Sequence, residues 1–326
     1  MSDDDAGQMT TVLIHSPYPR QRSQGNAVTA KRMTALLREE GLDVAIHERG
    51  DAPMAAQCLI ALNARKSAKE IFEFHHRQPD SQIVALLTGT DVNHPDMLRP
   101  ESDTRAALEL ASAIVSLHEG FSHRIADDLL EKTQVIYPSV RLPQAAKHQP
   151  GKTHDVVIAG NFRAEKNPDL MLQAVRGMVG QSLNFHAYGL GGDFLDQLEQ
   201  TAAECANFHY HGVQDHEVVL ANMQTAHVLL NTSTEEGGAN AVCEAVALGL
   251  PVVASKIAGN IGMLGDDYAG FFRSGDPASL VHALDRSLTD DGFYRRLKGQ
   301  VAERAHLFSP RSEARRWGEL IRRLLK

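Results

Sequence analysis

Apolar and polar positions alternate along this chain in the way typical of parallel α/β proteins. Short runs rich in Val, Ile and Leu are followed by longer stretches with helical periodicity, and the alternation repeats. In the first half the predicted strands are residues 10–16, 44–48, 58–64, 82–88, 113–117 and 133–138. The predicted helices between them are residues 26–41, 65–78, 101–110 and 119–131. This pattern predicts one doubly wound domain.

The alternation stops at residues 141–154 and then begins again. The stretch RLPQAAKHQPGKTH has two prolines, a glycine and no apolar periodicity, so it is predicted to be a linker. Beyond it the predicted strands are residues 155–161, 182–189, 207–212, 227–233, 251–256 and 270–275, and the predicted helices are 167–179, 193–203, 215–224 and 240–248. We therefore expect the boundaries to be an N-terminal domain (1–142), a linker (143–154), a second domain (155–308) and a terminal helix (309–326). Two doubly wound domains in sequence imply a cleft, with ligands bound by the loops that follow the strands.

Composition narrows the class of protein. The 326 residues carry a formal net charge of −8, shared evenly between the two halves, so neither half is basic enough to favour nucleic acid or an anionic membrane. No apolar run has the length of a membrane span, and the acidic start MSDDDAGQ is unlike a signal peptide. We expect a cytoplasmic protein without stable membrane association. The three cysteines are widely spaced and are predicted to be buried thiols, and the 16 histidines show no metal-ligand spacing.

The run TEEGGANAVCEAVALGLPVVAS, residues 234–255, is the most informative part of the chain. It follows a predicted strand, passes through Glu236-Gly237-Gly238-Ala239-Asn240 and enters a helix that Gly249 and Pro251 close. A helix that begins after a glycine-rich turn presents unpaired amides and the positive end of its dipole, which suits a phosphate. Glu244, one to two turns into the helix, is placed to reach hydroxyl groups of the same ligand. The alternative is a glycine turn and an amphipathic helix whose two glutamates are solvated.

A second candidate phosphate element is AGNFRAEKNPDLMLQAV, residues 159–175. Arg163 and Lys166 lie on the predicted loop, and Asn167-Pro168 opens the next helix as a cap followed by a proline. A guanidinium and an ammonium three residues apart can hold a diphosphate from one side. Taken alone, such a pair is more often solvated.

The first domain offers three candidate binding loops. Arg20 and Arg22 precede Gly25-Asn26, which opens a helix after the first strand. The segment ALNARKSA places Arg65 and Lys66 at a helix start, and LLTGTDVN places Thr88, Gly89, Thr90 and Asp91 after a strand. Small hydroxyls and cations at strand ends suit a small anionic acceptor, so we expect Arg20, Arg65, Thr88, Thr90 and Asp91 to bind it.

The order of strand, Glu-Gly-Gly, helix, Glu-Ala and Gly-x-Pro-Val-Val-Ala-Ser resembles the donor-binding segment of retaining GT-B glycosyltransferases. The resemblance implies a GT-B fold of two Rossmann-like domains facing a cleft. It further implies that Glu244 holds the donor ribose, that Glu236 lies by the sugar, and that Arg163 and Lys166 hold the diphosphate. The amides of Gly237 to Asn240 would contact sugar and phosphate, and the Gly25-Asn26 loop would approach the phosphates from the first domain. On this basis Glu236, Arg163 and Lys166 are the expected catalytic residues.

The segments PYPR, GNAVTAKR, LIALNARKSA and LLTGTD, together with the run from Glu236 to Phe272, resemble the selenosugar synthase family of the selenoneine pathway. That family joins selenophosphate to the anomeric carbon of a UDP-sugar such as UDP-N-acetylglucosamine. Two acceptor-side positions depart from the family's usual residues: Asn63 stands where His is common, and Val92-Asn93 where Leu-Tyr is common.

The resemblance implies UDP-sugar and selenophosphate (or thiophosphate) as substrates, with no metal and no further cofactor. Fixed positive groups would stabilise charge on the leaving UDP, as a metal does elsewhere. Two alternatives stay open: a retaining O-glycosyltransferase that uses a sugar or lipid hydroxyl with Asp91 or a histidine as base, and a nucleotide-sugar-binding protein without turnover. A Rossmann oxidoreductase is poorly supported, because no GxGxxG follows the first strand.

The tail SPRSEARRWGELIRRLLK, residues 309–326, is a basic amphipathic helix. In GT-B enzymes the terminal helix commonly crosses back onto the first domain. A helix lying on a membrane surface is the alternative.

Overall fold

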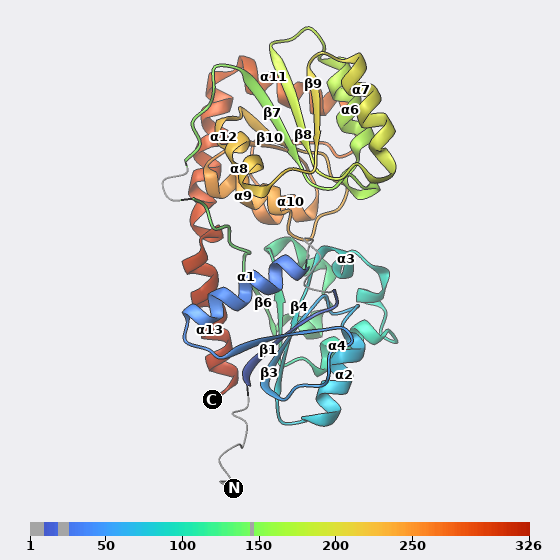
Figure 1. Ribbon diagram of the computed structural model, residues 1–326, viewed down its shortest axis with the longest axis vertical. Helices are drawn as coiled ribbons and strands as arrows, with labels where there is room; N and C mark the ends of the chain where they lie inside the picture. The colour runs from blue at the N-terminus through green and yellow to red at the C-terminus, as the bar shows by residue number, and fades with distance from the viewer. Residues whose placement is uncertain (1–9, 19–25, 144–146) are drawn as a thin grey trace. The chain divides into compact units, whose positions relative to one another are not determined.

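The structure, a computed structural model, describes residues 10–18, 26–143 and 147–326. The chain divides into two compact units, residues 1–137 with 310–326 and residues 138–309 (Figure 1). Each unit contains one six-stranded parallel sheet, as the alternating pattern predicted. Among the described residues, no helix combines the length and the apolar character that crossing a bilayer requires.

In the first unit the strand order is β2-β1-β3-β4-β5-β6. The strands are β1 (Thr10–Ser16), β2 (Val44–Glu48), β3 (Ala56–Leu62), β4 (Gln82–Leu86), β5 (Ala113–Ser116) and β6 (Thr133–Val135). The helices are α1 (Asn26–Glu39), α2 (Ala68–Arg77), α3 (Gly89–Val92), α4 (Asp103–Leu110), α5 (Asp127–Leu130) and α13 (Pro310–Leu324), with 3-10 turns η1 (Pro95–Leu98) and η2 (Glu119–Arg124).

Both faces of this sheet are covered by helices. Side chains along each strand point alternately to opposite faces, and because both sets are apolar, each face packs against helices. Val12 and Ile14 pack with Trp317 and other side chains of α1 and α13 on one face. Leu13 packs with side chains of α2 and α4 on the other. Figure 1 shows α1 and α13 on one side of this sheet and α2 and α4 on the other. Residues 310–326 therefore complete the core of the first unit.

In the second unit the order is β12-β11-β10-β7-β8-β9. The strands are β7 (His154–Ala159), β8 (Leu183–Tyr188), β9 (Phe208–Gly212), β10 (Val228–Asn231), β11 (Val252–Ser255) and β12 (Phe271–Phe272). The helices are α6 (Pro168–Gly177), α7 (Leu195–Glu204), α8 (His216–Thr225), α9 (Asn240–Leu248), α10 (Ala258–Leu264), α11 (Pro277–Thr289) and α12 (Asp291–Arg304), with 3-10 turns η3 (Ala164–Lys166), η4 (Gly192–Phe194) and η5 (Ala305–Phe308).

The structure differs from the sequence-based elements in a few places. The helix predicted over residues 119–131 is two short pieces, η2 and α5, because the backbone at Ala126 is extended (φ −64°, ψ 144°). The GTD triplet, predicted as loop, forms the one-turn helix α3. The stretch predicted as a linker is tied to the second unit, since the amides of His148, Gln149 and Gly151 donate to the carbonyls of Leu248, Gln224 and Thr225.

Candidate donor site in the second unit

The two predicted phosphate loops leave neighbouring strands. In the second unit β7 lies between β8 and β10. On one side of β7 the chain adds β8 and then β9, and on the other side it adds β10, β11 and β12. Ligands of doubly wound sheets bind at such a reversal of strand order, beyond the carboxyl ends of the strands. The loop of residues 160–167 follows β7, and the loop of residues 232–239 follows β10. The topology therefore brings the segments containing Arg163, Lys166 and Glu236 to one place.

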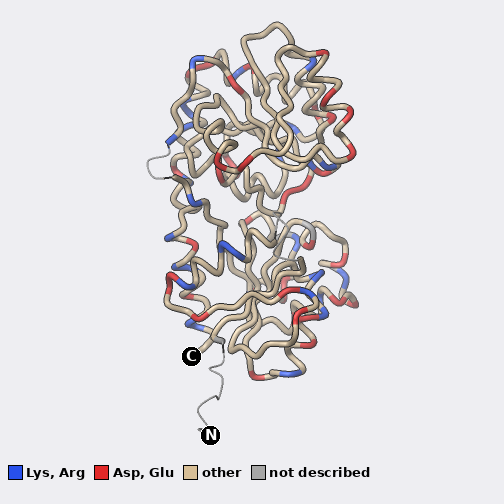
Figure 2. The backbone as a smooth tube through the Cα atoms, viewed as in Figure 1, with Lys and Arg blue, Asp and Glu red and all other residues tan. Residues whose placement is uncertain are grey.

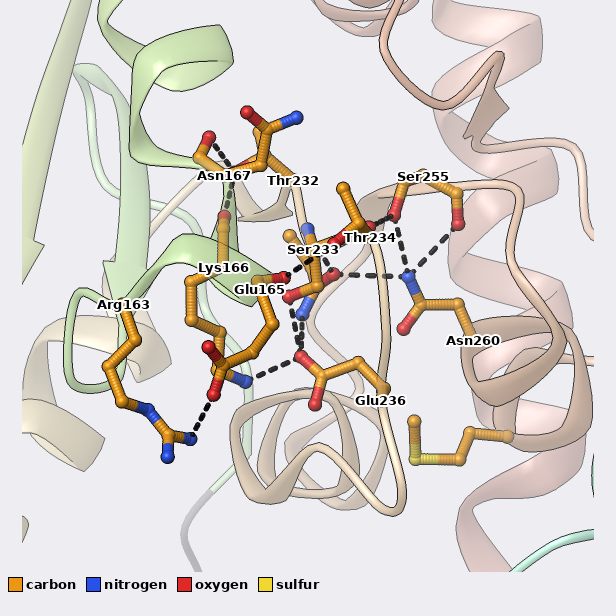
Figure 3. Close-up of polar contacts among 12 residues, drawn as sticks. Arg163, Glu165, Lys166, Asn167, Thr232, Ser233, Thr234, Glu236, Ser255 and Asn260 are labelled. Atoms are coloured by element: carbon orange, nitrogen blue, oxygen red, sulfur yellow. Dashed lines mark hydrogen bonds and ion pairs between the residues drawn. The ribbon is translucent and has the colours of Figure 1, made fainter. Parts of the chain in front are cut away.

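Lys166 and Glu236 form a close ion pair at this point. Lys166 Nζ lies 2.6 Å from Glu236 Oε1 (Figure 3). The same oxygen accepts from Ser233 Oγ at 2.6 Å and from Asn231 Nδ2 at 3.0 Å. Glu236 Oε2 has no hydrogen bond to the residues that the structure describes, so one carboxylate oxygen is held in place and the other is available to a ligand.

The environment of Glu236 favours its ionised form. Burial raises the pKa of this carboxyl, whose residue is only 8% exposed. The charge of Lys166 and the hydrogen bonds from Lys166, Ser233 and Asn231 outweigh burial and lower the pKa below its ordinary value. The alternative of a solvated Glu236 is thereby excluded, because the glutamate belongs to a buried polar network.

A further layer of polar residues holds this network. Asn260 Nδ2 donates to Asn231 Oδ1 at 3.0 Å and to the carbonyl oxygen of Ser255 at 2.9 Å. Ser255 Oγ donates to the carbonyl oxygen of Ser233. A Cβ added to Gly259 would lie 2.5 Å from the carbonyl oxygen of Glu236, so only glycine allows α10 to approach this closely. The supporting residues Asn231, Ser255, Gly259 and Asn260 were not identified individually from the sequence, although Gly259 and Asn260 lie in the run from Glu236 to Phe272.

The loop after β7 is shaped by an unusual backbone conformation. Asn167 has left-handed angles (φ 49°, ψ 57°), and α6 begins at the following Pro168. The predicted helix start is therefore in the right place, but the Asn167 side chain makes no capping hydrogen bond. Thr232 Oγ1 instead ties the two loops together by donating to the carbonyl oxygen of Lys166 at 2.8 Å. Asparagine suits this position because it tolerates the left-handed region better than most residues do.

Arg163 lies on the same loop as Lys166 but is more exposed. Its side chain is 58% exposed, and Nη2 lies 3.0 Å from Glu165 Oε1 (Figure 3). An exposed ion pair of this kind contributes little stability, so the guanidinium can exchange Glu165 for another anion at small cost.

The glycine-rich turn leads into α9 as expected. The helix begins at Asn240 after Ala239, which cannot cap the first amides with its side chain, and Gly238 has a φ of 139°. Glu244 lies in the second turn, and its Oε1 is 2.8 Å from Nε2 of His216, the first residue of α8. The Glu244 side chain is only 13% exposed, while that of His216 is 60% exposed. The hydrogen bond to Glu244 raises the pKa of His216.

His216 was not identified from the sequence. A single histidine among 16 has no spacing signal, and its contact with Glu244 depends on α8 and α9 packing side by side.

In the first unit Asp91 has a different place from the predicted one. It is fully buried, and its carboxylate accepts from the amides of Thr88 (2.6 Å), Ala64 (2.8 Å) and Val92 (3.0 Å). Thr88 Oγ1 also accepts from Asn63 Nδ2 at 2.8 Å. The prediction that Asp91 contacts an acceptor, or serves as its base, is corrected: the carboxylate joins the loops after β3 and β4 and is not presented to a ligand.

The remaining predictions in the first unit, for the acceptor site and for the Gly25-Asn26 loop at the donor phosphates, are placed only in part. Arg65 is partly buried, and its Nε has no hydrogen-bond partner among the described residues. Asn26 is the first residue of α1 and is 9% exposed. Arg20, Arg22 and Gly25 lie outside the described residues, as does the side chain of Thr90.

The three cysteines lie where the sequence-based reasoning placed them. Cys58, Cys205 and Cys243 are all buried free thiols, as predicted. Within residues 10–18, 26–143 and 147–326, the structure contains no group of three or more His, Cys, Asp or Glu placed to hold a metal ion.

Solved structures share this architecture over nearly the whole chain. Sucrose-phosphate synthase from Thermosynechococcus elongatus superposes with a TM-score of 0.77 at 17% identity, covering 97% of this chain and 99% of that one. Anabaena HepE, solved in complex with UDP and glucose, gives 0.72 at 15% identity, covering 96% and 100%. The expected GT-B fold is confirmed.

Sequence comparison decides the family. The family described as glycosyl transferases group 1 matches residues 142–304, which is half of the 326 residues. The chain belongs to this glycosyltransferase family. A D-inositol 3-phosphate glycosyltransferase from Nocardioides sp. (strain ATCC BAA-499 / JS614) is 26% identical in an alignment 262 positions long that covers 71% of this chain. The chain spans about half (54%) of the length of that relative.

Proposed function

We propose that this group 1 glycosyltransferase takes its sugar from a UDP-sugar and binds the nucleotide in the second unit. The observation that carries the proposal is the Lys166–Glu236 pair, which joins the two loops flanking the reversal of strand order. Anabaena HepE, which shares the fold, was solved with UDP and glucose.

The proposed roles follow from charge and position. Lys166 keeps further N–H donors besides the one given to Glu236, and exposed Arg163 adds a guanidinium on the same loop. Together with the uncapped amides from Gly237 to Asn240, these groups would stabilise the negative charge that builds on the leaving UDP. Glu244 would accept hydrogen bonds from the ribose hydroxyls, since His216 occupies one acceptor position of a carboxylate that has about four.

Glu236 fits a role beside the transferred sugar. Its Oε1 is fixed by three donors, and Oε2 is left to a sugar hydroxyl. An ionised carboxylate at this point would also stabilise the positive charge that develops at the anomeric carbon as UDP leaves.

We further propose that the acceptor is selenophosphate or thiophosphate, as the resemblance of the first-unit segments implies. The chalcogen would attack the anomeric carbon while the bond from that carbon to the β-phosphate oxygen breaks and UDP leaves. Water then removes phosphate from the chalcogen. A selenophosphate nucleophile is already ionised, so no strong base is needed, which agrees with the buried position of Asp91.

An acceptor with a hydroxyl group is the second candidate. It is favoured by the D-inositol 3-phosphate glycosyltransferase that matches 71% of the chain. Like selenophosphate, the acceptor named for that relative carries phosphate, so cationic side chains such as Arg65 would serve either one.

Mass spectrometry after incubation with UDP-sugars and selenophosphate distinguishes these acceptors. A selenium-containing sugar formed together with UDP supports the first. A glycosylated inositol phosphate, formed in a parallel incubation while selenophosphate stays unreacted, supports the second. Failure to release UDP from any UDP-sugar, with or without acceptor, would contradict the UDP-sugar proposal itself.

A further inference from the structure

The terminal helix α13 is basic on a protein that is acidic as a whole. Residues 310–326 contain five arginines and one lysine against two glutamates, whereas the whole chain has a formal charge of −8. Lys and Arg positions recur along this helix (Figure 2). Its apolar side is already used, because Trp317, Leu320 and Ile321 are buried against the sheet of the first unit. This helix therefore cannot insert its apolar face into a membrane without unfolding the core, and its basic face needs a separate explanation.

Part of this basic charge is neutralised within the protein. Arg322 Nη2 lies 2.8 Å from Glu40 Oε2, and Arg315 Nη1 lies 3.4 Å from Glu319 Oε1. Arg316 and Arg323 differ, because neither forms an ion pair with a carboxylate of the described residues. These two side chains lie seven residues apart and hence on the same side of the helix, about 10 Å apart along its axis.

Both arginines are held toward the edge strand β6. Arg316 Nη1 donates to the carbonyl oxygen of Val135 at 3.1 Å, and Arg323 Nη2 donates to Gln134 Oε1 at 3.3 Å. Each guanidinium uses one N–H in this way and keeps the others. Anchored guanidiniums lose less conformational freedom when they bind an anion than mobile ones do.

Between β6 and α13 lies a groove of about 450 Å³. Arg315, Arg316 and Arg323 line it with Glu319, and three positive charges against one negative leave a formal charge of +2. Gln134 also lines this groove, and its buried Nε2 has no hydrogen-bond acceptor in the part of the chain that the structure describes. Buried amide donors normally have a partner, so this one indicates an acceptor that the chain does not supply.

We propose that this groove binds phosphate oxyanions, apart from the nucleotide site. Its available polar groups are mainly donors, and planar guanidiniums match phosphate oxygens in pairs. The spacing of Arg316 and Arg323 suits a ligand with more than one phosphate, or several lipid headgroups, better than a single ion. The phosphate comes either from a soluble phosphorylated compound or from the headgroups of an anionic membrane that the helix touches without insertion.

The test uses the full chain and two probes. Pyrophosphate binding is measured by calorimetry with saturating UDP present, so that the nucleotide site is occupied. Sedimentation with vesicles of phosphatidylglycerol, compared with phosphatidylcholine, tests the membrane source. Arg316→Gln and Arg323→Gln keep hydrogen-bond donors near β6 while removing the charge. Arg311→Gln removes the same charge from an exposed position of the same helix that does not line the groove.

We expect each groove variant to weaken binding of at least one probe fivefold or more, and Arg311→Gln to change it less than twofold. Loss confined to pyrophosphate identifies a soluble ligand, and loss confined to phosphatidylglycerol identifies a membrane surface. Binding of neither probe by the wild-type protein, or equal loss in all three variants, overturns the proposal. Unchanged melting curves show that the variants remain folded. Because UDP binding is measured on the same samples, failure of the nucleotide proposal would be recognised separately.

Discussion

Replacing Lys166 with methionine tests the physical basis of the donor site. The substitution keeps most of the aliphatic stem and removes the charge that lies 2.6 Å from Glu236. Breaking a buried ion pair by removing one partner costs about 3–5 kcal/mol. The Lys166 side chain is 23% exposed, and Glu236 keeps its bonds to Ser233 and Asn231, so we expect a smaller loss of about 2–3 kcal/mol. For a unit of this size that corresponds to a fall in Tm of about 4–12 °C.

The sign of the pH dependence makes the test specific. In the wild-type protein the pKa of Glu236 is lowered, so this carboxylate contributes stability above its unfolded pKa, and the contribution is lost as the pH falls through the lower folded value. Without Lys166, only the hydrogen bonds from Ser233 and Asn231 offset burial, so we expect burial to dominate and the folded pKa to lie above the unfolded one. The variant should then lose stability as the pH rises from the unfolded pKa to the folded one. Its deficit relative to wild type should therefore shrink on acidification.

Thermal melts followed by circular dichroism between pH 4.5 and 8 measure both effects. The double variant Lys166→Met/Glu236→Gln should recover at least half of the lost stability, because the neutral amide no longer needs a cation. Lys152→Met, at an exposed lysine of the same unit, serves as the control and should change Tm by less than 2 °C, since surface substitutions cost about 0.5 kcal/mol or less. A deficit that is constant across the pH range, or a double variant as unstable as the single one, would refute the reasoning.

Three further outcomes are expected. Asp91→Asn should destabilise the protein by about 1–3 kcal/mol in chemical denaturation, because one amide oxygen cannot replace a carboxylate that accepts hydrogen bonds from three backbone amides. Burial raises the pKa of Asp91 to about 7, so the stability of the wild-type protein relative to this variant should fall as the pH rises from 4 to 7. His216→Ala should weaken UDP binding about threefold to tenfold in calorimetry, because Glu244 loses the hydrogen bond that fixes its side chain, and one hydrogen bond has roughly this value. The same substitution should not weaken binding of 2′,3′-dideoxy-UDP, which lacks the ribose hydroxyls that Glu244 would bind. Trp317→Ala should cost about 3–5 kcal/mol in the same denaturation assay, because the side chain is 1% exposed in the core of the first unit; a loss below 1 kcal/mol would contradict that packing.

Much of the fold was predictable because parallel strands buried on both faces leave a strong apolar pattern. All twelve strands were placed, and helices α1 and α9 begin where the pattern predicts. The helices α10, α11 and α12 were not predicted. Two of them carry a local signal that was available: Asp276 and Asp290 are side-chain caps, accepting from the amides of Ser279 and Phe293.

The site was predictable where residues follow strands in sequence and less so where packing brings them together. That the segments of Arg163, Lys166 and Glu236 lie close together could be predicted, because the loops after neighbouring parallel strands meet at one edge of the sheet. The polar network around Glu236 could not be predicted, since Asn260 reaches Asn231 only after α10 packs against the loop that carries Glu236. The burial of Asp91 was missed for a related reason. The sequence alone does not distinguish an aspartate that follows a strand and binds a ligand from one that accepts hydrogen bonds from the amides of its own loop.

Calorimetric titration of UDP in the presence of EDTA tests the central claim most directly, with wild-type protein compared with Lys166→Met and Glu244→Gln. We expect UDP to bind the wild-type protein without a divalent metal, and each variant to bind at least tenfold more weakly. Binding that requires added Mg²⁺, or equal affinity in all three proteins, would contradict the account of a nucleotide held by the cations and acids of the second unit.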